Sequence, residues 1–196
     1  MSDASAKRSV VHDLASTSAA SVRRATVADA AAIAALVNQA YAIEAFFVDG
    51  DRTDAAEIAA MMQTGSFIVL DDRGGLAGAV YIEGGQRRGY FGMLAVAPEQ
   101  QGHGLGKRLV RIAEALCEAA DCDVIALRII NLREELGRWY RSLGYREVGV
   151  TPYTHRPVKR PCHFIEMVKP LRPLAPRVSR APTYTGDIPL ELSSWG

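Results

Sequence analysis

The sequence predicts a mixed α/β domain of about seven strands and four helices, in which an antiparallel meander precedes a parallel crossover. Three strand-like segments at 66–70, 76–83 and 89–96 are separated by glycine-containing connectors of hairpin length. An amphipathic segment from Leu105 then leads into a continuous apolar run at 123–130. Such a run is typical of a buried central strand, so strand, helix and strand should form a right-handed crossover.

The composition predicts one compact domain without a strong charge bias. The chain has 196 residues, and its 23 basic and 22 acidic residues leave a formal net charge of +1. This balance argues against nucleic-acid and membrane-surface partners. No apolar run reaches the roughly 18 residues of a membrane span or forms a secretory signal, so we expect a cytoplasmic protein. Cys117, Cys122 and Cys162 lack the spacing of a zinc site or a disulfide framework.

The N-terminal part predicts a leader, a strand and two helices. Residues 1–20 are rich in Ser and Ala without a sustained period, which indicates a mobile leader. A short strand follows at 21–26. Thr26 and Asp29 form a capping-box pattern at the start of the first helix, and Thr53 is expected to cap the second.

The C-terminal part predicts one more helix, two strands and a tail. A helix at about 132–143 should stop at Gly144, and strands are expected near 145–151 and 162–168. The folded domain should therefore span 21–169. Residues 170–196 are dense in proline and are expected to form a tail.

A cluster of glycines lies at the start of the helix that opens at Leu105. It fits neither a Walker loop, because Arg108 follows Lys107, nor the dinucleotide fingerprint, because its spacing is GxGxG. Free amides at a helix N-terminus, the helix dipole and missing side chains together make an anion cradle. The alternative is a flexible turn whose glycines only permit tight packing.

Two segments resemble the GNAT superfamily of acyl-CoA-dependent N-acetyltransferases. The segment GMLAVAPEQQGHGLGKRLV at 92–110 is similar to that family's acyl-CoA-binding motif, and NLREELGRWYRSLGYREVG at 131–149 to its following helix and strand. The resemblance covers roughly residues 21–169. It implies acetyl-CoA as co-substrate, no metal, and a bulged strand at 93–97 that splays from the next parallel strand to leave a wedge.

The resemblance also implies roles for individual residues. Main-chain groups of Leu94 and Val96 would pair with the pantetheine arm, and the amide near Leu94 would stabilise oxyanion charge. Tyr140 would protonate the departing thiolate, its alternative being a core aromatic beside Trp139. Asn131 either contacts CoA or caps the next helix. The acyl-CoA contacts implied are Leu94, Val96, Gln101, Gly102, His103, Gly104, Leu105, Gly106, Lys107, Asn131 and Tyr140.

The attacking amine must be neutral, which raises the question of a base. A lysine-like amine is only about 0.04% neutral at pH 7, whereas an α-amino group is about 10–20% neutral. Glu83, at the end of the strand before the bulged one, and Glu44, near the end of the first helix, are the candidate bases. Each is alternatively a solvated surface carboxylate, and a proton path through water is also open.

The acceptor side is expected between the connection at 43–53 and the final hairpin loop at 151–161. Glu44, Asp49 and Asp51 could receive an ammonium. Arg156, Lys159 and Arg160 could receive a carboxylate or a phosphate, and the two sets together indicate a small amino-acid-like amine as acceptor. A peptide or protein N-terminus is the rival acceptor, and a non-catalytic acyl-CoA-binding regulatory module is the rival class. A homodimer is an expectation from the family alone.

Overall fold

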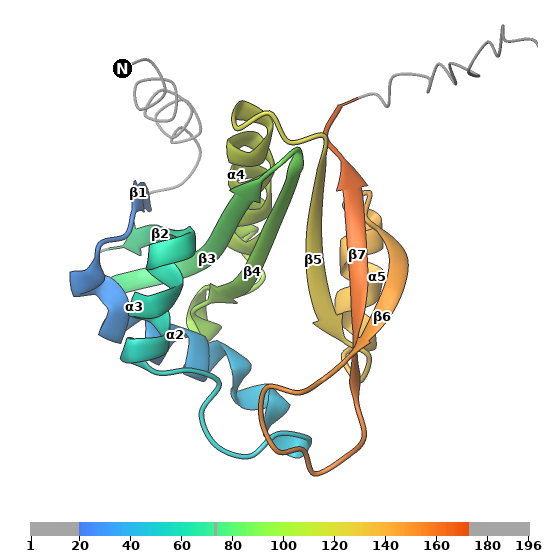
Figure 1. Ribbon diagram of the computed structural model, residues 1–196. Helices are drawn as coiled ribbons and strands as arrows, with labels where there is room; N and C mark the ends of the chain where they lie inside the picture. The colour runs from blue at the N-terminus through green and yellow to red at the C-terminus, as the bar shows by residue number, and fades with distance from the viewer. Residues whose placement is uncertain (1–19, 73, 173–196) are drawn as a thin grey trace, which may run out of the picture.

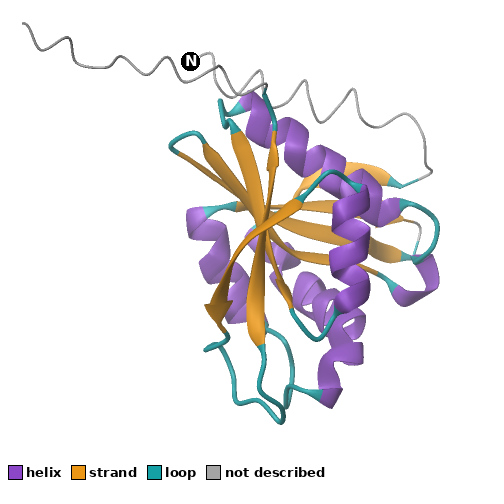
Figure 2. Ribbon diagram, turned by 90° about the vertical axis from the view of Figure 1, so that its right-hand side faces the viewer, coloured by secondary structure: helices purple, strands orange, loops and turns teal. Residues whose placement is uncertain are grey.

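The computed structural model describes residues 20–72 and 74–172, which form a seven-stranded mixed sheet with helices on both faces (Figures 1 and 2). The predicted fold class is confirmed. The strands are β1 (Ser21–Arg24), β2 (Ser66–Asp72), β3 (Gly75–Gly85), β4 (Arg88–Val96), β5 (Val124–Ile130), β6 (Arg146–Pro152) and β7 (His163–Pro170). The α-helices of the described chain are α2 (Ala30–Tyr41), α3 (Ala55–Thr64), α4 (Leu105–Ala119) and α5 (Glu134–Ser142). Short 3-10 turns occupy Val27–Asp29, Ala42–Phe46 and Pro98–Gln100.

The sheet has two halves that meet at β4 and β5. Its order is β1-β2-β3-β4-β5-β7-β6. Strands β2 to β4 pair antiparallel as the predicted meander, and β1 adds to it by pairing antiparallel with β2. Strands β4 and β5 pair parallel, with α4 as the crossover between them. Strand β7 then inserts between β5 and the edge strand β6. The position of the site depends on the junction between β4 and β5.

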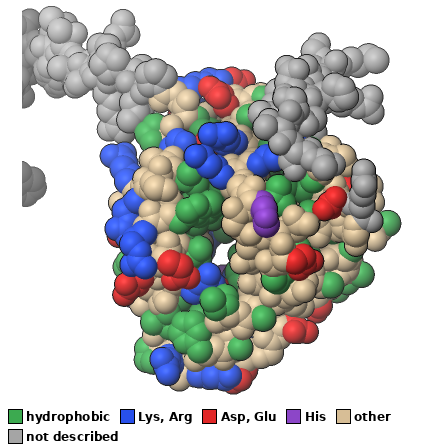
Figure 3. Space-filling view, turned by 180° about the vertical axis from the view of Figure 1, so that it is seen from behind, with side chains coloured by type: hydrophobic (Ala, Val, Ile, Leu, Met, Phe, Trp, Pro, Cys, Tyr) green, Lys and Arg blue, Asp and Glu red, His purple; other side chains and the backbone are tan. Residues whose placement is uncertain are grey.

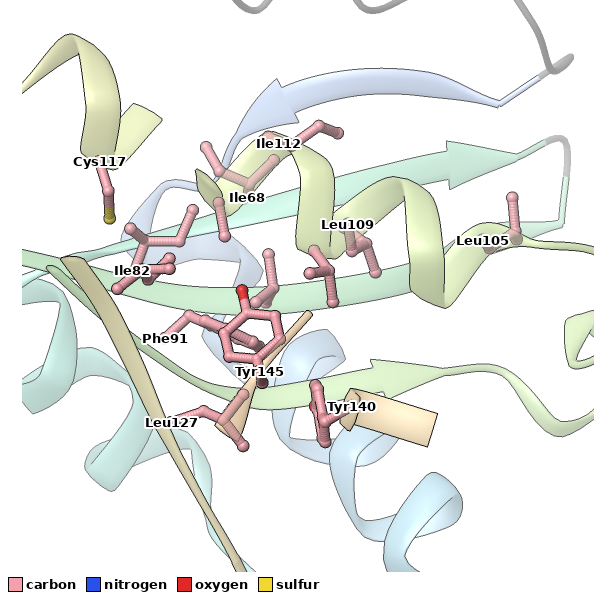
Figure 4. Packing of buried hydrophobic residues seen from close by; sticks show 14 of the residues in the cluster. Ile68, Ile82, Phe91, Leu105, Leu109, Ile112, Cys117, Leu127, Tyr140 and Tyr145 are labelled. Carbon is pink, nitrogen blue, oxygen red and sulfur yellow. The ribbon is translucent and has the colours of Figure 1, made fainter. Parts of the chain in front are cut away.

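Each face of the sheet has its own hydrophobic core, because apolar side chains alternate along the strands. Helices α2 and α3 cover one face, where Ile33, Val37 and Ile58 are buried against β2 and β3. Helix α4 covers the other face through residues such as Leu109 and Ile112, and α5 adds Tyr140 to the same core (Figures 2 and 4).

Of the two predicted N-terminal helix starts, one is as expected and the other differs. The Thr26–Asp29 capping box is present, with the Thr26 N–H donating to Asp29 at 2.7 Å. The expected cap at Thr53 is wrong, because Asp54 caps α3 and accepts from the Glu57 N–H at 2.8 Å. The backbone of buried Thr53 is instead held by the side chain of Asn38, at 2.9 and 3.0 Å.

The start of α5 also differs from the expected capping box at Asn131. Arg133 occupies the N-cap position, and no side chain caps this helix. The amide oxygen of Asn131 accepts from the backbone N–H of His163 at 2.8 Å, so this side chain ties the end of β5 to the start of β7. A bond across the sheet has replaced the local cap.

The expected leader and tail lie largely outside the described residues, which begin at Ala20 and end at Arg172. Strand β7 continues to Pro170, and the Leu171 N–H donates to the Asp123 carbonyl at 2.8 Å.

Candidate active site

Strand β4 carries a bulge in its second half. Gly92 lies opposite Tyr81 and Ala95 opposite Ala79, so Met93 and Leu94 together face the single residue between those two on β3. Met93 has a φ of +47°, which a side-chain-bearing residue rarely adopts. The extra residue changes which side chains face which core. Met93 packs with the α2 and α3 side, while Leu94 packs with the α4 and α5 side.

The bulge lies where β4 leaves its parallel partner. Only three residue pairs join β4 to β5, and the last of them is Tyr90 with Ala126. Beyond this point, the two strands diverge (Figure 1). A cavity of about 470 Å³ opens at the divergence. Residues 90–94 of β4 and 127–130 of β5 line it, and Figure 3 shows the surface hollowed near the centre of the view.

The glycine loop leaves its backbone open. Gly102 and Gly104 have φ values of +81° and +83°, and a Cβ built on either would meet no atom within 4 Å. Gly104 is the N-cap of α4, and the first backbone bond of the helix runs from the Arg108 N–H to the Gly104 carbonyl at 3.0 Å. The preceding amides therefore have no acceptor within the helix. Tight packing explains neither of these two glycines.

The rest of the loop is divided between exposed and packed residues. His103 and Lys107 are exposed, and Leu105 is buried in the core. A Cβ on Gly106 would lie 3.6 Å from Trp139, so this glycine is part of the contact between α4 and α5. The Gln101 side chain donates to the Val96 carbonyl at 3.1 Å.

Tyr140 lines the cavity from α5 and is 5% exposed. Its ring packs against Trp139 at a centroid distance of 4.7 Å. On the core side it meets Phe91 and Tyr145 at 6.0 and 5.7 Å (Figure 4). Within the described chain, its hydroxyl makes no hydrogen bond, whereas that of Tyr145 donates to Glu114 at 2.8 Å. Burial raises the pKa of Tyr140 well above its usual value, so the phenol stays protonated. This residue lies both in the core and at the cavity, so its position is compatible with either expected role.

The far end of the cavity is charged. Glu44 is 6% exposed and accepts from Arg133 at 3.2 Å, and burial raises the pKa of its carboxyl. Arg156 donates to both oxygens of Glu57, at 2.9 and 3.0 Å. The two loops that form this end are joined, because Val48 forms a β-bridge with Val158 and the Lys159 N–H donates to the Phe47 carbonyl at 2.8 Å (Figure 1).

Comparison with known proteins identifies the domain. A family model of an acetyltransferase (GNAT) domain matches residues 63–147, which include the bulge, the glycine loop and Tyr140. Residues 63–147 therefore carry the sequence pattern of a GNAT acetyltransferase domain. No curated protein sequence matches the chain significantly.

Solved structures share the GNAT fold over most of the chain. One is yncA of Salmonella typhimurium, a proposed acetyltransferase solved with its cofactor acetyl-CoA, at 20% identity and a TM-score of 0.63 over 82% of this chain and 99% of that one. Nourseothricin acetyltransferase is 20% identical, with a TM-score of 0.64 over 79% and 100%. The ribosomal-protein-S18-alanine N-acetyltransferase of Escherichia coli is 18% identical, with a TM-score of 0.59 over 81% and 98%.

The GNAT cavity brings together part of the set predicted from the sequence. Leu94, Tyr140, Glu44 and Arg156 all line it. Asp49 does not: it is exposed and pairs with Lys159 at 2.9 Å.

Glu83 lies at a second, smaller cavity of about 320 Å³. There it accepts from the Tyr81 hydroxyl at 3.1 Å. Tyr90 and Arg128 line both cavities of the GNAT domain.

Arg52, Arg128 and His155 line the GNAT cavity and were not anticipated from the sequence. Arg128 left a signal, because it is a single charge within the otherwise apolar strand VIALRII. Arg52 and His155 belong to loops whose course the sequence does not define.

Metal-ligand clusters and membrane-spanning helices are both absent from the described residues. These residues hold no group of three or more His, Cys, Asp or Glu side chains placed to bind a metal ion. None of their helices is both long enough and apolar enough to cross a membrane.

Proposed function

We propose that this chain is an N-acetyltransferase that moves an acetyl group from acetyl-CoA to a primary amine of a small, amino-acid-like molecule. The observation that carries the proposal is a single cavity that contacts the bulge of β4, Tyr140 and the charged acceptor end. The GNAT match supports the acyl transfer, and the charges at the acceptor end support the choice of acceptor.

The residues present fit acetyl-CoA. Gly102 and Gly104 leave the backbone open, and the unpaired amides and dipole of α4 favour a diphosphate there. Leu94 and Val96 offer main-chain groups where β4 has no parallel partner. The Val96 carbonyl already accepts from Gln101, but a carbonyl has two lone pairs and can accept a second bond. When bound, acetyl-CoA supplies the acetyl group as an activated thioester.

The chain contributes a donor and an acid. The main-chain N–H near Leu94 polarises the acyl carbonyl, and a donor of this type is typically worth about 10²–10³ in rate. Tyr140 gives its proton to the departing thiolate. The burial that raises the pKa of the phenol also raises the basicity of a thiolate released beside it, so the transfer stays feasible.

Glu44 is the better placed of the two candidate bases. It lines the cavity with Tyr140, whereas Glu83 lies at the second cavity. Its raised pKa makes it a stronger base than an exposed glutamate, and Arg133 fixes its orientation. An α-amino acceptor needs this help less than a lysine-like amine does.

The test is release of free thiol from acetyl-CoA across amino acids, polyamines, aminoglycosides and short peptides, with CoA binding measured on the same sample. Turnover on amino acids supports the proposal. Turnover on peptides alone moves the function to the acetylation of peptide N-termini. Binding without any turnover indicates a non-catalytic acyl-CoA-binding module, and absence of CoA binding refutes the proposal.

A further inference from the structure

The acceptor end of the cavity has more positive than negative side chains. Its charged lining consists of three arginines and two glutamates: Arg52, Arg128, Arg156, Glu44 and Glu57. Both glutamates are already bound, Glu57 by Arg156 at 2.9 Å and Glu44 by Arg133 at 3.2 Å. The cations that remain are therefore available to a ligand of negative charge.

Arg128 is the arginine without a polar partner. Across the residues that the structure describes, its guanidinium makes neither a hydrogen bond nor an ion pair. It lies over two aromatic rings instead, with its central carbon 5.7 Å from the Tyr90 ring centre and 5.8 Å from that of Phe164. Rings on which a guanidinium stacks hold its plane and leave its N–H groups unused.

The backbone places Arg128 at the divergence of the two half-sheets. It follows Ala126, the last residue of β5 that pairs with β4, by two positions and therefore lies on the same face of the strand. Its neighbours Leu127 and Ile129 point to the opposite core. Arg128 lines both cavities, so a molecule bound in either one lies near this guanidinium.

The other two arginines are less available. Arg156 is occupied by Glu57, although the sequence alone suggested it as the carboxylate ligand. Arg52 donates to the Tyr153 hydroxyl at 3.3 Å and lies 5.5 Å from the Tyr41 ring centre. All three still act on His155, whose pKa is lowered by partial burial and by the guanidinium groups of Arg52, Arg128 and Arg156. The positive potential at this end of the cavity therefore disfavours the protonated form of His155.

We infer that Arg128 binds the carboxylate of the acceptor, and that the substrate class is amino acids with a free α-carboxylate. The inference rests on the proposed function and adds to it the group that selects the acceptor. A guanidinium fork matches a carboxylate through two parallel N–H···O bonds. A peptide has a neutral amide where the free amino acid has its carboxylate, so Arg128 disfavours peptides by leaving a charge unpaired.

The experiment compares each of the twenty L-amino acids with its carboxamide, in wild type, Arg128→Gln, Arg128→Lys and Arg146→Gln. Arg146 is a matched control, because it is an exposed arginine on the edge strand β6, away from both cavities. Thiol release gives kcat and KM, and calorimetry in the presence of CoA gives acceptor binding without turnover.

Wild type and Arg146→Gln should prefer the acid to its amide. Arg128→Gln should raise KM for the acid about 10- to 100-fold, with little change for the amide, and Arg128→Lys should restore part of the preference. Turnover with equal use of acid and amide, unchanged in Arg128→Gln, refutes this inference and leaves the proposed function standing. If CoA binds but no amine is bound or turned over, both are refuted.

Discussion

Replacement of Tyr140 by phenylalanine separates the chemical role of this residue from its structural one. The ring contacts with Trp139, Phe91 and Tyr145 remain in the variant. Only the hydroxyl is lost, and within the described chain it bonds to no other group. The free energy of unfolding should therefore change by less than about 1 kcal/mol. Loss of a general acid should lower kcat by about 10²–10⁴.

Tyr145→Phe is the matched control in the same aromatic cluster. The Tyr145 hydroxyl donates to Glu114 at 2.8 Å, and Lys169 also donates to that carboxylate at 2.9 Å. Its removal costs one hydrogen bond, about 1 kcal/mol, and leaves Glu114 paired. We expect Tyr140→Phe to keep the stability of the wild type and lose kcat. Tyr145→Phe should lose stability and keep kcat.

The assay combines thiol release, chemical denaturation and CoA binding on both variants. Tyr140→Phe should bind CoA like the wild type, because the phenol hydroxyl is not part of the glycine loop that is proposed to bind the CoA diphosphate. Full kcat in Tyr140→Phe would refute the assignment of the acid. Equal loss of kcat in both tyrosine variants would show that the aromatic cluster acts through packing alone.

Three further predictions concern the loop, the buried carboxyl and the thiols. Gly104→Ala places a side chain at a φ of +83°, which should destabilise the fold by about 1–2 kcal/mol and weaken CoA binding. Gly50→Ala, at a φ of +75°, is the control: it should cost the same stability and leave CoA affinity unchanged. Equal CoA affinities of the two variants would count against the anion cradle. Because burial raises the pKa of Glu44, its protonated form stabilises the fold below the ordinary glutamate pKa, and this stability is lost as pH rises through the raised value. In chemical denaturation, Glu44→Gln should therefore gain stability over wild type with rising pH, and a constant difference would contradict the burial effect. Burial raises the pKa of the Cys117 thiol to about 12 and Cys162 is only half-buried, so a thiol reagent should label Cys162 first, and equal labelling rates in the folded protein would be unexpected.

Sequence patterns predicted the elements of this fold well because the patterns are local. The period-two and helical stripes locate the strands and helices to within a few residues. The helix caps were harder, because Thr53 and Asp54 are both good N-cap residues and only the tertiary bond between Thr53 and Asn38 decides between them. The capping alternative for Asn131 failed for the same reason, since its partner His163 lies far along the chain.

The site was predictable where it depends on a motif and not where it depends on loops. The glycine loop and Tyr140 belong to motifs with fixed spacing, and both reach the expected part of the fold. Asp49 and Arg156 were proposed from charge alone, and each forms an ion pair within the protein. Charge content cannot show which loop cations are already paired, whereas the lone charge of Arg128 in an apolar strand could have been noticed.

The short ladder between β4 and β5 links the stability of this fold to its ligand. Strands β4 and β5 separate after three residue pairs. Beyond that point, their facing edges have backbone N–H and C=O groups that do not pair across the two strands and can hydrogen-bond to an extended ligand. A ligand that binds there and not to the unfolded chain stabilises the protein by about 2.7 kcal/mol when its concentration is a hundred times its Kd. The melting temperature of this protein then depends on the ligand concentration. Without ligand, the protein should melt at a lower temperature and be cleaved faster by a protease than with ligand.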